Sequence, residues 1–317
     1  MTCKTSTSLN RLHLLLMKRV IFILFATISC ISHIHSAHHN DIICSSNTFE
    51  NFNKEFSYES FSLGNITLQY RKAEIYLNYC DSTPLIIYLH GGSARGKDNT
   101  LQLNEKGIQD IYEYLSSRNI PSILIAPQCP PNEGWTNQNR KVIYELAKDF
   151  IQRGVIDANR IYILGGSMGG TGTWCQLSHF PNFYAGAMPV AGNPNGMNTE
   201  NIASTPVLTV MGSADNIMNL EAVELLQQEV ISLGGTLILD IEEGWTHANT
   251  CEQSYTNERL DWLFSKKLNE LTKIQYTKGT STPFRDTYHD MSGRPTDTPY
   301  KGIYIKKRNK YIVKKIK

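Results

Sequence analysis

The sequence predicts an α/β fold in which a mostly parallel sheet carries helices on both faces. Short apolar runs rich in β-branched residues alternate with longer stretches whose apolar residues recur at helical spacing. The short runs are apolar throughout, which is typical of parallel strands buried on both faces. With 317 residues and 41% apolar content, the chain is long enough to bury one large core, so we expect a single catalytic domain.

The expected elements follow one another along residues 60–265. An antiparallel hairpin of 66–70 and 74–77 opens the sheet. Gly234 and Gly235 end the last predicted helix, as glycines often do. The remaining predicted strands are 84–89, 161–164, 206–211 and 236–241, and the predicted helices are 101–118, 138–153, 171–180 and 219–233.

The segment 160–172, R-I-Y-I-L-G-G-S-M-G-G-T-G, places one serine between glycines at the end of an apolar strand. A serine hydroxyl is a weak nucleophile, so an enzyme holds it on a sharp strand-to-helix turn near a base and backbone N–H donors. Gly165-x-Ser167-x-Gly169 provides such a turn, because glycines tolerate strained backbone and leave space around the hydroxyl. We therefore expect Ser167 to be a nucleophile; an incidental serine in a glycine-rich turn is the alternative.

A second glycine motif follows the predicted strand 84–89, where the chain continues as His90-Gly91-Gly92-Ser93. Backbone N–H groups in such a loop form part of an oxyanion hole in enzymes with a nucleophile turn of this kind. We expect the donor to be Gly91 or Gly92, acting together with the N–H of Met168. His90 precedes the donors, and we expect it to have a structural role.

The acid and the base are expected downstream of the serine. Strand 206–211 runs into Gly-Ser-Ala-Asp, which makes Asp215 the expected acid, with a turn or helix-cap role as the alternative. Strand 236–241 leads to Glu-Glu-Gly-Trp-Thr-His, which makes His247 the expected base. Glu242 and Glu243 are weaker candidates for the acid because they lie so close to His247 in sequence.

The order Ser167, Asp215, His247 is the order that α/β-hydrolases use. On the segments L-H-G-G-S (89–93), A-P-Q-C-P (126–130), G-G-S-M-G-G (165–170) and G-S-A-D (212–215), the chain resembles secreted esterases of that superfamily, including feruloyl and acetyl esterases. Prolyl-oligopeptidase-like peptidases share these motifs. His247 lies in W-T-H-A-N, where relatives more often have a glycine near the histidine. The resemblance implies an acyl-enzyme mechanism that requires no cofactor and no metal.

Residues 1–36 are typical of a signal peptide, and Met17 is an alternative start that would make residues 1–16 an extension. A Lys-Arg pair at 18–19 precedes a short apolar run, and small and polar residues follow near position 36. The run is too short for a permanent membrane anchor. The segment T-I-S-C ending at Cys30 resembles a lipobox, so a lipoprotein is an alternative. We expect an exported protein that is periplasmic, attached to the cell surface or secreted.

Cleavage near residue 36 would leave five cysteines in an oxidising compartment. They could form up to two disulfides, whose pairing the sequence leaves open. None of them lies on a glycine turn like that of the serine, so a cysteine nucleophile is the weaker hypothesis. The five are Cys44, Cys80, Cys129, Cys175 and Cys251.

The net charge of +2 is unevenly distributed. Residues 1–36 hold four basic residues and residues 301–317 hold eight, with no acids in either segment, so the body has 19 basic against 29 acidic residues. A nucleic-acid partner is therefore not expected. Residues 290–317, with D-M-S-G-R and K-G-I-Y-I, resemble the C-terminal segments of exported Bacteroidetes proteins, which implies a small β-rich appendage for secretion or surface attachment. A solvated basic tail is the alternative. We expect 266–289 to be a linker.

Three functional hypotheses follow. The first is an exported serine esterase that releases acyl groups, such as feruloyl or acetyl, from small-molecule or polysaccharide-linked esters. The second is a prolyl-oligopeptidase-type peptidase, which the absence of room for a gating domain disfavours. The third is a noncatalytic binding protein on the same fold. We expect the loops 92–104, 128–139 and 192–204 to shape the pocket, with Trp135 and residues 193–195 as candidate lining residues.

Overall fold

The computed structural model describes residues 51–77 and 83–268, and the backbone of four short strands further along the chain. The chain divides into two compact units, residues 1–268 and 269–317. The predicted signal peptide, Cys30, Cys44 and Cys80 lie outside the described residues.

The strands of the second unit form a four-stranded sheet in the order β10-β9-β11-β12. The first of them lies within the segment that we expected to be a linker. Their bounds are β9 (Tyr288–His289), β10 (Pro295–Thr296), β11 (Ile305–Arg308) and β12 (Tyr311–Lys314).

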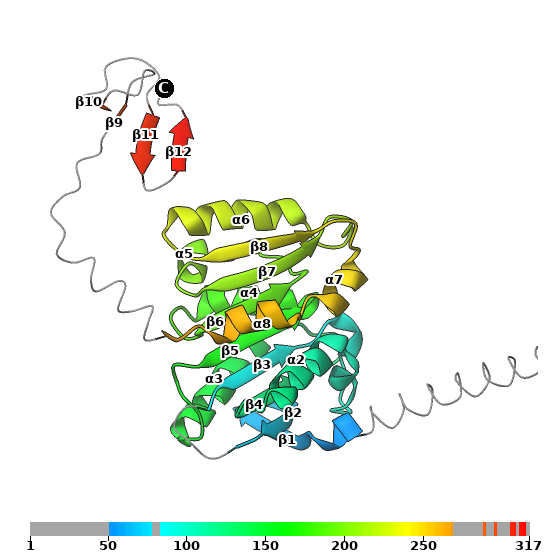
Figure 1. Cartoon of the computed structure of the whole chain (residues 1–317). Coiled ribbons are helices and arrows are strands. Elements are labelled where there is room, and N and C mark those ends of the chain that lie inside the picture. Colours follow the sequence, from blue (N-terminus) through cyan, green and yellow to red (C-terminus); the bar gives the residue numbers. More distant parts are fainter. Residues whose placement is uncertain are drawn as a thin grey trace, which may run out of the picture. The chain divides into compact units, whose positions relative to one another are not determined.

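The first unit is built on an eight-stranded sheet in the order β1-β2-β4-β3-β5-β6-β7-β8 (Figure 1). Strand β2 pairs antiparallel with β1 and with β4, and the other neighbours are parallel. The predicted α/β class is thus confirmed. The strands are β1 (Ser57–Leu63), β2 (Ile66–Ile75), β3 (Leu85–Leu89), β4 (Ser122–Pro127), β5 (Ile161–Gly166), β6 (Gly186–Val190), β7 (Val207–Gly212) and β8 (Leu237–Glu242).

The opening hairpin differs from the prediction. The expected strand 66–70 and the first two residues of the expected strand 74–77 belong to the single strand β2, and its hairpin partner is β1. The polar residues in the middle of β2 do not break the strand, because Arg71 is buried and donates to the carbonyls of Asn53 and Phe56. The turn lies instead between β1 and β2, where Gly64 has a φ of 59°.

The helices pack on both faces of this sheet. The predicted helix 101–118 is wrong in one respect: it is split at Glu105, whose backbone is extended, into a short 3₁₀ helix and α2. The 3₁₀ helices are η1 (Gly92–Ala94) and η2 (Leu101–Asn104), and the α-helices are α2 (Lys106–Ser117), α3 (Asn139–Gln152), α4 (Met168–His179), α5 (Thr199–Ile202), α6 (Leu220–Ser232), α7 (His247–Gln253) and α8 (Asn257–Phe264).

Two layers of core hold the sheet between the helices. Along β3, Leu85, Ile87 and Leu89 join the cluster that contains side chains of α3, α4 and α6, while Ile86 and Tyr88 join the cluster that contains side chains of α2 and α8. All five are essentially inaccessible to solvent. A strand with apolar side chains on both faces is what a sheet covered on both sides requires.

The chain crosses from one side of β3 to the other between β4 and β5, since β3 pairs with both. In open α/β sheets, ligands bind beyond the carboxyl ends of the strands at such a switch point. The segments that follow β3, β5, β7 and β8 therefore gather at one edge of the sheet (Figure 1). These are the segments that contain the predicted site residues.

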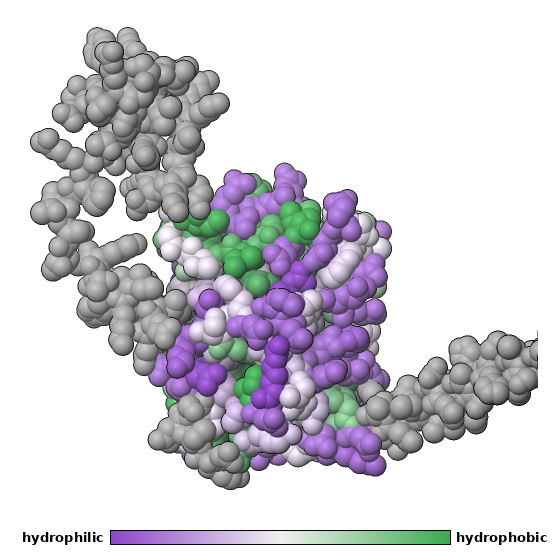
Figure 2. Space-filling view, viewed as in Figure 1, coloured by the Kyte–Doolittle hydropathy of each residue, from purple (hydrophilic) through white to green (hydrophobic). Residues whose placement is uncertain are grey.

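The face of the first unit shown in Figure 2 has an apolar region near α6 and β8. Large exposed apolar side chains here are Leu225, Ile231, Leu233 and Ile241, and none of them lines the pocket described below. No helix in the described part of the chain is both long and apolar enough to cross a membrane.

Candidate active site

Ser167 lies on the turn between β5 and α4, in a strained backbone conformation. Its φ is 57° and its ψ is −117°, a region that residues other than glycine rarely occupy. Its N–H donates to the carbonyl of Val190 at the end of β6 (3.0 Å), which ties the turn to the neighbouring strand. The strained turn is the backbone geometry of a nucleophile elbow, which lifts the serine hydroxyl above the end of the sheet.

Glycines allow helix α4 to begin directly against the sheet. A Cβ on Gly169 would lie 1.8 Å from the carbonyl oxygen of Leu89, and one on Gly165 would lie 2.5 Å from the same atom. Since no real Cβ approaches an oxygen so closely, the helix would have to move away from β3 if either residue had a side chain. The glycine pattern of the motif therefore sets how close Ser167 comes to the segment that follows β3.

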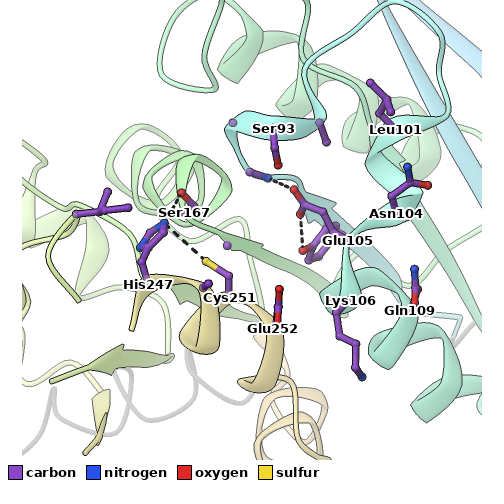
Figure 3. Close-up of a pocket in the computed structure, with 17 residues that line it drawn as sticks. Ser93, Leu101, Asn104, Glu105, Lys106, Gln109, Ser167, His247, Cys251 and Glu252 are labelled. Atoms are coloured by element: carbon purple, nitrogen blue, oxygen red, sulfur yellow. Dashed lines mark hydrogen bonds between the residues drawn. The ribbon is translucent and has the colours of Figure 1, made fainter. Parts of the chain in front are cut away.

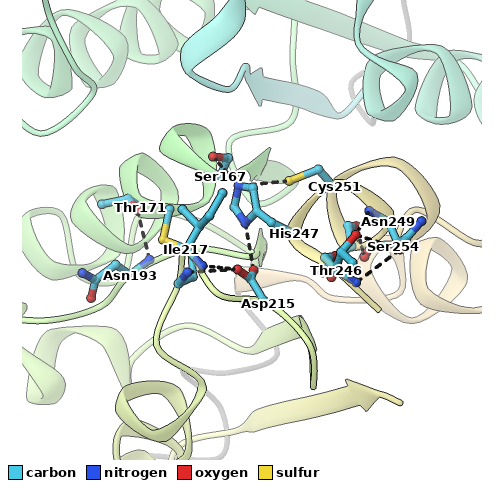
Figure 4. A network of polar contacts seen from close by, with 12 residues as sticks. Ser167, Thr171, Asn193, Asp215, Ile217, Thr246, His247, Asn249, Cys251 and Ser254 are labelled. Carbon is cyan, nitrogen blue, oxygen red and sulfur yellow. Dashed lines mark hydrogen bonds and ion pairs between the residues drawn. The ribbon is translucent and has the colours of Figure 1, made fainter. Parts of the chain in front are cut away.

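His247 links the serine to the aspartate (Figure 4). Its Nε2 lies 2.8 Å from the Oγ of Ser167, and its Nδ1 lies 2.8 Å from an Oδ atom of Asp215. A carboxylate only accepts hydrogen bonds, so Nδ1 carries the proton and Nε2 accepts the proton of the serine hydroxyl. The three residues thus have the contacts and the tautomer that base-activated attack by a serine requires.

Asp215 is held in place by hydrogen bonds other than the one to the histidine. Its side chain is fully buried, and its second oxygen accepts the backbone N–H groups of Ile217 (2.8 Å) and Met218 (3.0 Å). One oxygen of Asp215 thus makes the contacts of a turn aspartate, and the other makes the contact with His247 that the acid of the predicted site requires. Glu242 contacts Arg259 instead, and Glu243 is exposed, so neither replaces Asp215.

The segments that carry Asp215 and His247 are bonded to each other. Ala214 N–H donates to the carbonyl of Trp245 (3.0 Å), and a Cβ on Gly212 would lie 2.2 Å from that carbonyl oxygen. Thr246 caps helix α7 in a capping box with Asn249, so His247 is the first residue of that helix. A regular helix end thus positions the base.

Cys251 lies one helical turn after the histidine, with its Sγ 3.9 Å from Nε2 of His247. Burial raises the pKa of its thiol to about 12, so the cysteine is a neutral neighbour of the site. Cys251, Cys129 and Cys175 are all free thiols. Any disulfide in this chain would therefore have to involve cysteines outside the described residues.

His90 has the structural role that we expected. Burial lowers its pKa to about 4, so the ring is neutral. Its Nε2 accepts the N–H of Cys129 (2.9 Å), which leaves the proton on Nδ1, and Nδ1 donates to the carbonyl of Gly91 (2.6 Å). The indole of Trp135 donates to the carbonyl of His90 itself (2.9 Å). The buried ring thus fixes the loop that follows β3.

These contacts decide which N–H of this loop faces the pocket. Gly91 N–H donates to a carboxylate oxygen of Glu105 (2.7 Å), so Gly91 is unavailable as an oxyanion donor and the prediction that included it needs correction. The carbonyl of Gly91 and the N–H of Gly92 belong to one planar trans peptide and point in opposite directions. Because His90 holds that carbonyl, Gly92 N–H points the other way and makes no hydrogen bond within the described residues.

Met168 provides the second candidate donor. It is the first residue of α4, and the first N–H groups of a helix have no partner within the helix. Gly92 and Met168 therefore remain as the donors that could bind an oxyanion, while the helix N-terminus favours negative charge at the same place.

A cavity of about 810 Å³ opens beside Ser167 (Figure 3). Its walls come from the segment after β3, from η2 and the start of α2, and from α7. Leu101 and Ile217 give it apolar surface, while Glu105, Gln109 and Glu252 give it polar groups. Of the three loops expected to form the pocket, only 92–104 does so; Trp135 is buried beneath His90, and residues 193–195 do not line the cavity.

Glu105 is the site residue that the sequence analysis missed. It lies at the break between η2 and α2, accepts Gly91 N–H on one oxygen, and accepts the hydroxyl of Tyr88 on the other (2.8 Å). Burial raises the pKa of its carboxyl to about 7, against these two hydrogen bonds, which lower it. A glutamate at the start of a predicted helix is ordinary, so no sequence pattern distinguished it.

Comparison with known proteins places this geometry in a family context. Residues 135–209, which include Ser167, match the model of the prolyl oligopeptidase family. No curated protein sequence matches the chain at a significant level.

Solved structures of both esterases and peptidases resemble the chain. A thermostable esterase is 27% identical with a TM-score of 0.63, over 68% of this chain and 64% of its own. The feruloyl esterase module from Clostridium thermocellum, in complex with sinapinate, has 17% identity and a TM-score of 0.53 over 67% of this chain and 88% of its own. An acylaminoacyl peptidase has 13% identity and a TM-score of 0.52 over 69% and 44%.

The match to the first of these esterases spans less than two thirds of that protein's length. The fold, the family model and the esterase and peptidase neighbours nevertheless agree in class. The chain has the α/β-hydrolase fold, and it is similar both to esterases and to prolyl-oligopeptidase-like peptidases of that fold.

Proposed function

We propose that the protein is a serine esterase that cleaves carboxylic esters through an acyl-enzyme formed on Ser167. The observation that carries the proposal is the pair of 2.8 Å contacts that His247 makes with Ser167 and Asp215 beside an open cavity. A base that is already hydrogen-bonded to a serine on a strained turn is the arrangement that acyl transfer needs.

In the first half of the reaction, Ser167 Oγ attacks the ester carbonyl carbon and His247 Nε2 takes the hydroxyl proton. The carbonyl oxygen becomes an oxyanion that Gly92 N–H and Met168 N–H bind. Asp215 stabilises the resulting imidazolium. The bond to the alcohol oxygen then breaks, and the imidazolium returns its proton to the leaving alcohol.

In the second half, water takes the place of the alcohol. His247 removes a proton from the water, the hydroxide attacks the acyl carbon, and the acid leaves as the proton returns to Ser167 Oγ. The same donors bind the second oxyanion. The free acid is the product, and the serine is regenerated without a cofactor.

The proposed substrates are esters of small or aromatic acids, such as acetyl or feruloyl groups, carried by a small alcohol or a polysaccharide. Support comes from the mixed walls of the cavity, with apolar surface at Leu101 and Ile217 and polar side chains at Glu105, Gln109 and Glu252. The feruloyl esterase module, at 17% identity, shares the fold.

A peptidase is the second candidate. The match of residues 135–209 to the prolyl oligopeptidase family model favours it. That match ends before Asp215 and His247, and elements common to both classes fall inside it. It therefore favours a serine hydrolase more strongly than it favours a peptide substrate.

The test compares hydrolysis of aryl acetate, methyl ferulate and proline anilide by the purified protein and by its Ser167→Ala variant. We expect ester turnover in the wild type and a loss of at least about 10⁴-fold in the variant, because no other group replaces the nucleophile. Proline anilide should be a poor substrate.

Two outcomes would contradict the proposal. Turnover of the anilide in preference to both esters would favour the peptidase. Ester turnover that survives in Ser167→Ala, or the absence of turnover on every substrate, would count against acyl transfer by this serine. Circular dichroism and thermal unfolding of both proteins establish that the variant is folded.

A further inference from the structure

Glu105 is a partly buried acid that the proposed reaction does not use, although it lies in the wall of the cavity beside Ser167 (Figure 3). Its oxygens accept Gly91 N–H (2.7 Å) and Tyr88 O–H (2.8 Å). It makes no ion pair within the described residues, and the neighbouring Lys106 pairs with Asp110 instead. A carboxyl that is raised in pKa and unpaired with a cation costs folding stability, so a purely structural reason for it is weak.

The loop that Glu105 contacts depends on hydrogen bonds to fix the orientation of its peptide units. Gly91 and Gly92 have no Cβ, so side-chain sterics do not restrict the rotation of the peptide units before and after Gly91. Two peptide units determine where Gly92 N–H points. The unit that joins His90 to Gly91 is held at its carbonyl by Trp135 and at its N–H by Glu105. The next unit is held at its carbonyl by the His90 ring.

Of the four polar groups in these two units, three are therefore bonded, and only Gly92 N–H makes no hydrogen bond within the described residues. The bond from Glu105 also approaches the loop from the cavity side, where no other side chain contacts the Gly91 N–H. A Cβ on Gly91 would come within 3.1 Å of the Glu105 oxygen, so the glycine and the acid fit each other closely.

We propose that Glu105 is a positioning residue for the oxyanion hole, whose carboxylate holds Gly91 N–H and thereby fixes the peptide that aims Gly92 N–H at the reacting carbonyl oxygen. This inference rests on the proposed function, because an oxyanion hole matters only for acyl transfer at Ser167. It requires an acceptor at this place and does not require a charge.

Three titratable groups that lie next to Glu105 are uncharged near neutral pH, while Lys106, His247 and Glu252 line the same cavity. The three are Tyr88 on β3, Cys251 on α7 and Tyr255 just after α7, and the pKa of each is raised by burial. A glutamine would therefore meet the same three neutral groups and could still accept Gly91 N–H through its carbonyl oxygen.

The experiment measures ester hydrolysis by three variants at position 105. Glu105→Ala and Glu105→Leu both remove the acceptor, one leaving a space and the other filling it. We expect kcat to fall about 10- to 100-fold in both with KM changed less than about threefold, since an oxyanion donor acts in the transition state. Glu105→Gln should retain kcat within about threefold. Glu113→Ala, an equivalent change at an exposed position of α2, is the matched control.

A reversible inhibitor provides a second readout. The serine hydroxyl adds to the carbonyl carbon of an aryl trifluoromethyl ketone, and the carbonyl oxygen becomes an alkoxide at the place where the oxyanion forms. Its inhibition constant should rise in Glu105→Ala and Glu105→Leu by about the same factor as kcat/KM falls, and should stay near the wild-type value in Glu105→Gln. A residue that merely supports the fold would not produce this parallel.

Three results would overturn the inference. Wild-type kcat in the alanine and leucine variants would mean that the loop needs no acceptor. A loss in Glu105→Gln equal to that in Glu105→Ala would mean that charge rather than position matters. A loss confined to KM would indicate substrate binding. Failure of the proposed function is a separate result, because it shows as wild-type turnover that is absent or independent of Ser167.

Discussion

The two sides of Ser167 are positioned by different means. On the acid–base side, side chains bond to side chains: Asp215 comes from the loop after β7 and His247 from the start of α7, 32 residues further along the chain, and they meet at 2.8 Å. On the oxyanion side, the reactive groups are backbone N–H groups, and buried or partly buried side chains hold the backbone. His90, Trp135 and Glu105 each bond to a peptide group of the segment that follows β3.

The difference shows how the same accuracy is reached with different residues. A side chain on a helix end or a strand end is positioned by its rotamer and one or two hydrogen bonds, so a histidine and an aspartate are sufficient. A glycine peptide has no side-chain rotamer to fix it, so the direction of its N–H depends on how many of the adjoining backbone N–H and C=O groups are already hydrogen-bonded. The acid–base side can therefore be disabled by one substitution, whereas the oxyanion side should weaken in steps.

Among the variants that leave the nucleophile in place, the largest effect is expected from Asp215→Asn, which breaks the acid–base side alone. The amide can still accept Ile217 N–H, but its NH₂ group favours the wrong tautomer of His247. We expect kcat for ester hydrolysis to fall by about 10³- to 10⁴-fold, with thermal stability little changed. Steady-state kinetics and thermal unfolding measure the two quantities.

The same variant tests the independence of the two sides. The backbone donors that bind the alkoxide of the trifluoromethyl ketone, Gly92 and Met168, do not contact Asp215. A loss of less than about tenfold in kcat for Asp215→Asn would mean that His247 does not depend on this carboxylate. The acid–base side would then not be disabled by one substitution.

The next effect is expected from Gly169→Ala, which acts on both sides through the backbone. The added Cβ would lie 1.8 Å from the carbonyl oxygen of Leu89, so the start of α4 must move away from β3 and carry Ser167 and Met168 with it. We expect a loss of about 3 kcal/mol in the free energy of unfolding and a strong loss of activity. Urea unfolding and ester hydrolysis measure them.

Gly134→Ala is the matched control, because a Cβ at Gly134 would meet no atom within 4 Å. It should change neither quantity measurably. Wild-type stability in Gly169→Ala would show that α4 can shift at little cost, and the elbow would then not depend on close packing.

The sequence predicted the parts of the fold in which apolar runs and glycines act together. β3, β5, β7 and β8 are apolar runs that end in loops, and parallel strands bring their carboxyl ends to one edge, so Ser167, Asp215 and His247 meet there. Their separation of 80 residues between serine and histidine is no obstacle once the sheet is formed.

The sequence did not reveal parts that depend on single polar side chains. Strand β1 is an edge strand with a largely polar sequence, and the polar residues Arg71 and Lys72 in the middle of β2 give that single strand the sequence pattern of two. The choice of Gly92 over Gly91 depends on Glu105, which lies 14 residues from Gly91 and carries no motif. Contacts of this kind follow from the packed structure, not from a local pattern.

The smallest effect is expected in the dependence of stability on pH, which tests whether the oxyanion side is buried as described. Burial raises the pKa of Glu105 from 4.5 to about 7, so between these values the folded protein holds a proton that the unfolded chain has released. The free energy of unfolding therefore falls as pH rises through this range. His90, with its pKa lowered to about 4, acts oppositely and destabilises the fold as pH falls below 6.5.

Glu105→Gln removes the first dependence and keeps the second. Relative to wild type, its free energy of unfolding in urea should rise by roughly 1–3 kcal/mol between pH 5 and pH 8 and then level off. Glu113→Gln, at an exposed site on α2, should show no such rise. A flat difference for Glu105→Gln would mean that the carboxyl titrates as it does in water. The loop after β3 would then be held by His90 and Trp135 alone, and the two sides of Ser167 would differ less than their contacts indicate.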